Sequence, residues 1–218
     1  MVMDIIYLGH SSFKLSGKDA SVVTDPFDPK MVGLRYPQIS ADIVTVSHEH
    51  GDHDKIESVT DVHKVIKGPG EYEIRGISII GYPSFHDSKE GKERGKNTIF
   101  VYEIDGIRLV HLGDLGHKLT ESLVNQLGDV DVLMVPVGGV YTIDFEVAVE
   151  VVRQIEPKII IPMHYKIKGM NEEMFGKLTE PQEFTSALGY KIEETGKLSL
   201  KPGALADGEQ TVVLLSIK

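Results

Sequence analysis

Six consecutive residues, His-Glu-His-Gly-Asp-His at positions 48–53, constrain this chain more than any other part of its sequence. They directly follow the apolar segment Ile43–Val46, yet all but the glycine carry titratable side chains, which the interior of a buried strand would not tolerate. Because side chains alternate along a strand, His48 and His50 should point to the same side of its end. The two imidazoles could therefore bind one metal ion.

The second half of this motif offers a further pair of ligands. Gly51 permits a turn, after which Asp52 and His53 can face a second metal ion on the other side. Imidazole and carboxylate groups suit zinc, manganese or iron. The alternative is a solvated, histidine-rich loop. The complete His-x-His-x-Asp-His string is far more specific than two histidines alone, so we expect a metal site.

Two sites of three ligands each need more donors than this motif supplies, and three candidates lie elsewhere in the chain. Each lies just past a predicted strand: His86 after Ile77–Tyr82, Asp114 after Ile107–Leu112, and His164 after Lys158–Pro162. Open α/β sheets place their functional sites where strands end along one edge. We therefore expect these three residues to join the motif in one site.

Apolar periodicity predicts short strands in the first half of the chain and alternating helices and strands in the second. The expected strands are Met3–Tyr7, Ser12–Leu15, Val22–Thr24, Ile43–Val46, Lys64–Ile66, Ile77–Tyr82, Asn97–Ile104, Ile107–Leu112, Val130–Val137, Lys158–Pro162 and Thr211–Ile217. The expected helices are Leu119–Leu127, Asp144–Ile155 and Pro181–Leu188. Asp105-Gly106 and Arg75-Gly76 predict β-hairpins. The pattern favours one α/β domain over residues 1–218, with mixed sheets.

Charge and composition limit the partners. The chain has 23 Lys and Arg against 33 Asp and Glu, a formal net charge of −10, which argues against nucleic acid or an anionic membrane as the main partner. A small-molecule substrate is expected instead. Cysteine is absent, which excludes a Cys-type zinc site and a cysteine nucleophile. No apolar run reaches the ~18 residues needed to cross a bilayer, and Met1–Tyr7 has the pattern of a strand, so we expect a cytoplasmic protein.

Taken together, these motifs make the sequence similar to the metallo-β-lactamase superfamily, and within it to the small metal-dependent hydrolases related to L-ascorbate-6-phosphate lactonase. The resemblance covers nearly the whole chain and rests on Leu8-Gly9-His10-Ser11-Ser12-Phe13, Thr24-Asp25-Pro26-Phe27, His48–His53, His111–Asp114, Pro136-Val137-Gly138-Gly139, Tyr141-Thr142 and Ile161-Pro162-Met163-His164-Tyr165. It implies a four-layer αββα sandwich with the site at one end of the sheets.

The resemblance also implies a ligand set. The first metal would be held by His48, His50 and His86, and the second by Asp52, His53 and His164, with Asp114 bridging both. Many family members carry Gly-His-Thr around the third-motif histidine, whereas this chain has Phe85-His86-Asp87, which fits the lactonase-like branch. Asp25, which could otherwise only initiate a turn before Pro26, would hydrogen-bond a ligand histidine.

The expected activity is hydrolysis by hydroxide on the bound metal ions. The cations lower the pKa of bound water to ~7, so that hydroxide attacks the carbonyl or phosphoryl centre of a small ester, lactone or phosphoester at neutral pH. Asp52 could orient this nucleophile or return a proton to the leaving group, and Asp114 would hold both cations. The expected cofactors are two divalent ions, zinc first and manganese as the alternative.

Two other functions remain open from the sequence. One is an RNA-processing nuclease of the same superfamily, which the acidic charge and short chain oppose; the other is a metal-binding module with little turnover, which the complete ligand set opposes. Among the remaining histidines, His10 could be a turn residue or contact substrate. His111 is expected in a strand and His117 in a loop or at a helix start. His63 is expected at the surface. Lys89–Lys96 is expected as a solvated loop, although its cations could meet a phosphate.

Overall fold

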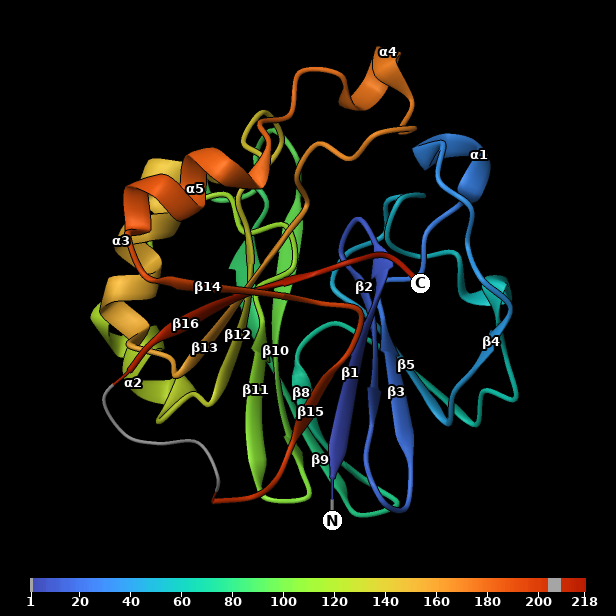
Figure 1. Cartoon of the computed structure of the whole chain (residues 1–218). Helices are drawn as coiled ribbons and strands as arrows, with labels where there is room; N and C mark the ends of the chain where they lie inside the picture. The colour runs from blue at the N-terminus through green and yellow to red at the C-terminus, as the bar shows by residue number, and fades with distance from the viewer. Residues whose placement is uncertain (1, 204–208) are drawn as a thin grey trace.

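The computed structural model describes residues 2–203 and 209–218, which form two large β-sheets packed face to face (Figure 1). From edge to edge, the six-stranded sheet consists of β15 (Leu198–Leu200), β1 (Met3–Gly9), β2 (Ser12–Ser16), β3 (Ser21–Thr24), β5 (Ile43–Val46) and β7 (Lys64–Lys67). Strands β15, β1, β2 and β3 are antiparallel neighbours, whereas β3, β5 and β7 run parallel. The mixed sheets predicted from the sequence are therefore confirmed.

The eight-stranded sheet carries most of the strands that lead to candidate site residues. Its order is β14 (Lys191–Thr195), β16 (Thr211–Leu215), β13 (Ile159–Met163), β12 (Val132–Pro136), β11 (Ile107–His111), β10 (Lys96–Ile104), β9 (Ile77–Phe85) and β8 (Gly70–Ile74). Strands β11 to β13 are parallel, and β10 is antiparallel to both β9 and β11. Strands β9, β11 and β13 thus run in the same direction, so that their C-terminal ends meet at one edge.

The core lies between the two sheets and is built from alternating apolar side chains. Tyr7 and Phe13 of the six-stranded sheet and Phe100 and Tyr102 of the eight-stranded sheet belong to one buried cluster. The hydroxyl groups of Tyr102 and Thr45 lie 2.7 Å apart and join the sheets by a hydrogen bond. Burial of each such side chain contributes ~1.5–3 kcal/mol to stability. This rigid core supports the strand ends on which the candidate site is built.

Three helices cover the outer face of the eight-stranded sheet (Figure 1). These are α2 (Glu121–Leu127), α3 (Phe145–Ile155) and α5 (Pro181–Leu188); α1 (Pro29–Val32) and α4 (Glu172–Phe175) are single turns. Helix α3 begins where the side chain of Asp144 accepts a hydrogen bond from the Val147 N–H, and its buried stripe includes Ala148, Val152 and Ile155. It therefore matches the helix expected at 144–155, with Asp144 as its N-cap.

Short segments cover the outer face of the six-stranded sheet. The strands β4 (Ile39–Ser40) and β6 (Val59–Thr60) pair with each other, and a 3₁₀ turn over Ile56–Ser58 lies between them in the chain. Their side chains pack with Val44 and Val46 of β5 in a second apolar cluster. The expected four layers are present, but this outer layer is built from β4, the 3₁₀ turn and β6 rather than from a long helix.

The elements agree with the sequence predictions in type and differ in extent. Strand β5 and helix α5 have the predicted bounds, and both hairpins form, with Ile104 opposite Ile107 and Ile74 opposite Ile77. Helix α2 begins two residues later than predicted because the Thr120 side chain caps it by accepting a hydrogen bond from the Leu123 N–H. Strands β4, β6, β14 and β15 and the short helices α1 and α4 were not predicted.

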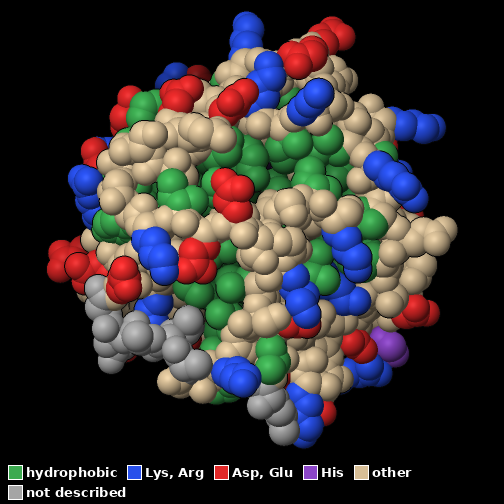
Figure 2. Space-filling model, in the orientation of Figure 1, with side chains coloured by type: hydrophobic (Ala, Val, Ile, Leu, Met, Phe, Trp, Pro, Cys, Tyr) green, Lys and Arg blue, Asp and Glu red, His purple; other side chains and the backbone are tan. Residues whose placement is uncertain are grey.

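Most histidines are buried rather than exposed. Six of the nine lie in the interior, and on the face in Figure 2 histidine is nearly absent among the apolar and charged side chains. Buried imidazoles need partners, so their concentration inside the protein points to a built site. No helix in residues 2–203 and 209–218 is both long and apolar enough to cross a membrane.

Candidate metal centre

The histidine motif forms a tight turn beyond the end of β5. The N–H groups of His53 and Asp54 both donate to the carbonyl oxygen of His50, at 2.8 and 3.0 Å. Strand β5 ends at Val46, so His48 and His50 lie in irregular backbone and not on a strand. The prediction that strand alternation makes the two side chains converge is therefore wrong, because the turn brings them together.

The first group of potential ligands consists of His48, His50 and His86. One nitrogen from each lies within 4.8 Å of the others. The His48 ring meets those of His50 and His86 edge-on, with centroids 4.6 Å apart in both pairs. His86 follows β9 directly, as predicted, whereas His50 is exposed and His48 and His86 are buried. The group is thus open to solvent on the side of His50.

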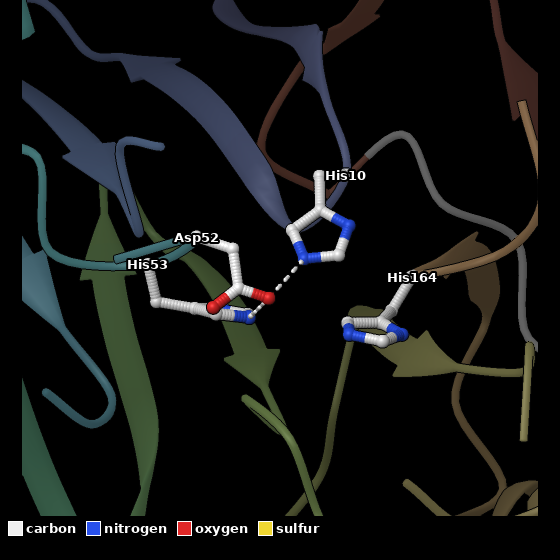
Figure 3. A group of neighbouring side chains, drawn as sticks. All are labelled: His10, Asp52, His53 and His164. Atoms are coloured by element: carbon white, nitrogen blue, oxygen red, sulfur yellow. Dashed lines mark hydrogen bonds and ion pairs between the residues drawn. The ribbon is translucent and has the colours of Figure 1, made fainter. Parts of the chain in front are cut away.

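The second group consists of His10, Asp52, His53 and His164, all buried (Figure 3). The Nε2 atom of His10 lies 3.2 Å from Oδ2 of Asp52, and Nε2 of His53 lies 3.7 Å from the same oxygen. His10 and His164 adopt left-handed backbone conformations just after β1 and β13, and the His164 N–H donates to the His10 carbonyl at 2.9 Å. Sequence reasoning left the role of His10 open; the structure places it beside Asp52.

Asp114 lies between the two groups. Its Oδ2 atom is 3.2 Å from Nε2 of His164 and 3.3 Å from Nε2 of both His53 and His86. Nε2 of His48 is 3.9 Å away. One carboxylate oxygen thus faces imidazoles from both groups. All seven residues predicted as ligands therefore lie in one cluster.

The loop that carries Asp114 is held in place by Asn97. The Asp114 N–H donates to Oδ1 of Asn97 at 3.0 Å, and Nδ2 of Asn97 donates to the Leu112 carbonyl and to Oγ of Ser84. Asn97 is buried in β10, which lies between β9 and β11. The side chain fixes Asp114 relative to the strand that precedes His86. Its role was not visible in the sequence, where it is simply the first residue of a predicted strand.

Asp25 orients two of the histidines. Its carboxylate accepts hydrogen bonds from the N–H and Oγ–H of Ser47, at 2.8 and 2.6 Å, and from Nδ1 of His53 at 2.9 Å. Because the Ser47 hydroxyl donates to Asp25, it accepts from Nδ1 of His48, 2.9 Å away. Both imidazoles therefore carry a proton on Nδ1 and direct Nε2 toward the centre of the site.

The charges of the cluster favour a cation. Burial opposes ionisation, but His164 and His53 hold the pKa of Asp114 well below its usual range. Burial likewise opposes a charge on His53, yet the carboxylates of Asp114 and Asp52 raise the pKa of His53 well above its ordinary value. Burial lowers the pKa of His48 to about 3, so this imidazole stays neutral at physiological pH. Two ionised carboxylates beside the neutral imidazole of His48 make a binding site for positive charge.

Unpaired polar atoms show that the site suits a metal ion. Seven buried side-chain atoms of the cluster lack a hydrogen-bond partner among the described residues: His10 Nδ1, His48 Nε2, His53 Nε2, His86 Nδ1, Asp114 Oδ1, His164 Nδ1 and His164 Nε2. Leaving such an atom unpaired costs about 1–3 kcal/mol. Imidazole nitrogens and carboxylate oxygens at this spacing are the donors that divalent zinc or manganese takes. The residues present thus fit a divalent metal.

The other histidines have structural partners outside the two groups. His111, at the end of β11, directs Nε2 to the Ser11 carbonyl at 2.9 Å and accepts the Gly113 N–H at Nδ1. It connects the loop before Asp114 to the turn that carries His10. His117 accepts a hydrogen bond from the Phe85 N–H at Nε2. Both lie where the sequence analysis expected residues without a ligand role.

Replacing Asp25 with asparagine is expected to weaken metal binding about 10–100-fold. The amide would present an N–H donor to Nδ1–H of His53, so that the ring would rotate or change tautomer and Nε2 would leave its position. Competition with a chromophoric chelator measures the affinity, with Asp19→Asn as the control because Asp19 is exposed. Equal affinities for the two variants would rule out the orienting role of Asp25.

Comparison with known proteins identifies the class of the chain. The profile of the beta-lactamase superfamily domain matches residues 4–164. A Thermotoga maritima protein assigned to the Zn-dependent hydrolases of the metallo-beta-lactamase superfamily is 37% identical, with a TM-score of 0.75 and 98% of each chain covered. The metallo hydrolase Igni18 of Ignicoccus hospitalis shares the fold, at a TM-score of 0.71 and 20% identity over 92% of this chain and 99% of its own. The chain belongs to the metallo-beta-lactamase superfamily.

Similar sequences narrow this assignment to one family. A relative from Staphylothermus marinus is 30% identical over 88% of this chain and 97% of its own length. Another from Thermococcus onnurineus is 27% identical over 94% of this chain and its entire length. Both are UPF0173 metal-dependent hydrolases, and the chain is a member of that family.

Proposed function

We propose that this protein is a dinuclear metal-dependent hydrolase of small esters, lactones or phosphoesters. The observation that carries the proposal is the position of Asp114, whose Oδ2 atom lies within 3.3 Å of His86 from the first group and of His53 and His164 from the second. A carboxylate between two sets of imidazoles suits two cations held side by side. Membership of a family of metal-dependent hydrolases supports the reaction type.

The two groups would divide the metals between them. The first would be held by His48, His50 and His86, the second by Asp52, His53 and His164, with Asp114 shared. Zinc suits this nitrogen-rich donor set, and manganese is the alternative. When bound, the two cations would supply Lewis acidity and lower the pKa of water at neutral pH.

Asp52 would accept a proton from the attacking water and pass it to the leaving group. Burial opposes its charge, but His53 and His10 hold the pKa of Asp52 well below its usual range, so the carboxylate is ionised. Nε2 of His10 donates to Oδ2 of Asp52 at 3.2 Å and fixes the orientation of the carboxylate. While it holds the metal, this carboxylate could also accept a hydrogen bond from an attacking water. The same carboxylate could then pass the proton to the leaving group. His50 is exposed at the open side of the site, where a small substrate could enter.

The lactone part of the proposal rests on sequence motifs. Segments such as Leu8-Gly9-His10-Ser11 and Pro162-Met163-His164-Tyr165 resemble those of the L-ascorbate-6-phosphate lactonase branch. In the structure these two segments lie together, because the His164 N–H donates to the His10 carbonyl. Lactones, other cyclic esters and open-chain esters share the carbonyl centre that such a site would attack, and a panel of all three would rank them.

Elemental analysis of the gently purified protein tests the proposal directly. We expect about two zinc or manganese ions per chain, and loss of hydrolysis after chelation that is regained when metal is returned. Lactones, aryl esters and phosphoesters form the substrate panel. One ion or none, with no hydrolysis gained on adding metal, would overturn the dinuclear hydrolase and favour a metal-binding module.

Replacing His50 with alanine is expected to lower the metal content from about two ions to about one and to reduce hydrolysis at least about 100-fold. His50 is exposed, so the change removes a ligand without leaving a cavity in the core. His63→Ala is the matched control, because His63 is also exposed and lies outside both groups. Full metal content and turnover in His50→Ala would contradict the ligand assignment.

A further inference from the structure

A cavity of about 770 Å³ opens beside the first group of histidines. Its lining includes His48 and His50 together with the segments 67–69, 83–85 and 94–98. These come from the end of β7, the end of β9 and the start of β10. A molecule bound in the cavity would therefore lie against two of the proposed metal ligands, which makes it the candidate substrate pocket.

The charge of this cavity is opposite to that of the chain. Its lining contains the cations Lys67, Arg94 and Lys96, and Glu49 is its one carboxylate, whereas the whole chain has a net charge of −10. A second cavity, of about 510 Å³ and without histidine in its lining, has the reverse balance of Glu73, Glu103, Asp105 and Arg108. The cavity beside the histidines is thus lined by more cations than carboxylates in an acidic chain, and we call it the basic cavity.

Two of its cations have donors to spare. Lys96 is exposed at the start of β10, and its ammonium group makes no hydrogen bond or ion pair with other described residues. Arg94 donates one N–H to the Val140 carbonyl at 3.2 Å and lies 5.0 Å above the ring of Tyr141, which leaves most of its five N–H groups free. Lys67 is partly neutralised by Glu49, 3.2 Å away. Arg94 and Lys96 are therefore the lining cations with N–H groups available to an anion.

The loop that presents Arg94 is held rigid by Asp87. The buried carboxylate of Asp87 accepts hydrogen bonds from four backbone N–H groups at 2.7–3.0 Å, those of Lys89, Gly91, Glu93 and Arg94. The loop returns to β10 at Gly95, whose carbonyl accepts the His86 N–H. A binding group on a preorganised loop loses little entropy when it engages its ligand. The loop is exposed, as the sequence predicts, and its carbonyl at Gly95 ties it directly to His86.

We propose that the basic cavity binds a second, oxyanionic group of the substrate, a carboxylate or a phosphate, through Arg94 and Lys96. The proposal rests on the proposed function, since it names the class of ester, lactone or phosphoester that the centre takes. Guanidinium and ammonium groups bind oxyanions by charge-assisted hydrogen bonds. Apolar side chains in the same lining would accommodate the carbon chain between the anion and the reacting bond: Val46, Pro69, Pro83 and Phe85.

Anion binding is measured first, because it does not require turnover. Calorimetry with inorganic phosphate and with glutarate compares the metal-loaded wild type with the double variant Arg94→Gln/Lys96→Gln. We expect the Kd of at least one probe to rise about tenfold in that variant. The control, Lys89→Gln/Lys92→Gln, removes the same charge from the same loop at residues outside the lining and should leave both Kd values unchanged. Arg94→Lys/Lys96→Arg should retain binding, and circular dichroism verifies the fold.

Kinetics then links the cavity to substrate choice. Two 4-nitrophenyl esters of equal length, one ending in a carboxylate and one in a methyl group, are compared, with a phosphate-ended ester as the third arm. In Arg94→Gln/Lys96→Gln the KM of the anionic esters should rise about tenfold and that of the neutral ester stay within about twofold. In the wild type, the difference in KM between the anionic esters and the neutral ester should also decrease as salt is added. The anionic ester whose KM rises more in the double variant identifies carboxylate or phosphate as the bound group.

The outcomes separate this proposal from the hydrolase itself. Unchanged probe affinity in Arg94→Gln/Lys96→Gln, or an equal loss in the Lys89→Gln/Lys92→Gln control, overturns the anion site even when esters are hydrolysed. Binding that depends on Arg94 and Lys96 in a protein that hydrolyses none of the substrates supports the anion site and overturns the proposed hydrolase. A tenfold change in both affinity and KM supports both.

Discussion

Replacing Asp114 with asparagine is expected to reduce the metal content of both groups, from about two ions per chain to well below one. The amide has the same shape but no charge. Among the described residues, Oδ2 of Asp114 is the one carboxylate oxygen within 3.9 Å of Nε2 atoms from both groups. Hydrolysis should fall with the metal, by at least ~1000-fold, because both cations lose an anionic ligand.

Equilibrium dialysis followed by elemental analysis measures this loss. Asp129→Asn is the matched control, since Asp129 is exposed in the turn after α2 and belongs to neither group. The Asp114 N–H donates from the backbone to Asn97, so the loop keeps its main tether in the variant. Metal content equal to that of the control would refute the shared position of Asp114.

A second measurement works on the metal-free protein. The carboxylates of Asp114 and Asp52 raise the pKa of His53 against the effect of burial, so Asp114→Asn should lower the pKa of His53. Histidine titration by NMR reports this shift directly. An unchanged pKa of His53 would mean that Asp114 does not control the charge of the cluster, whatever the metal content.

Local patterns predicted the strands that carry the site, because each has a strong apolar signal. Ile43–Val46 coincides with β5, and β9, β11 and β13 end within three residues of the site residues that were expected to follow them. Strand β14 escaped notice because Lys191–Thr195 is polar and largely exposed. It is ordered by parallel pairing with β16, a contact between distant segments that periodicity alone cannot reveal.

The site was predictable where its residues are neighbours in sequence and not where the fold joins distant segments. The string at 48–53 signals its own chemistry, whereas the contact of His10 with Asp52 spans 42 positions. That contact depends on positive φ angles at Gly9 and His10, which turn the chain sharply after β1. A histidine between Gly9 and Ser11 at a strand end was the only available signal, and it fits a turn equally well.

The basic cavity illustrates the same limit. The sequence shows Lys89–Lys96 as a run of charges, which is typical of a solvated loop. In the structure Asp87, two residues before that run, accepts hydrogen bonds from four backbone N–H groups and orders the loop. The ordered loop places Arg94 in the lining of the cavity, whereas Lys89 and Lys92 lie outside it. Which cation of a charged run faces a site depends on backbone hydrogen bonds that charge patterning does not contain.

Replacing Gly138 with alanine is expected to destabilise the protein by ~3 kcal/mol, lowering Tm by about 10 °C, and to reduce metal binding at the second group. A Cβ at this position would lie 2.1 Å from the carbonyl oxygen of His164 and 3.0 Å from Cα of Tyr165. Both are backbone atoms, so no side chain can rotate away. The chain after β13 would have to move, and it carries the His164 imidazole with it.

Calorimetry and metal analysis on the same samples test this expectation. Gly196→Ala is the control, because the Cβ there would meet only Oγ of Ser216 at an ordinary 3.6 Å and should change stability by less than ~0.5 kcal/mol. A Gly138→Ala protein with the control's Tm and full metal content would show that the segments of Gly138 and His164 do not approach so closely. Lower Tm with full metal content would show that the close approach supports the fold but does not position His164. Loss of both would show that His164 is placed by backbone packing between the loops after β12 and β13, and that the metal centre depends on a residue with no side chain.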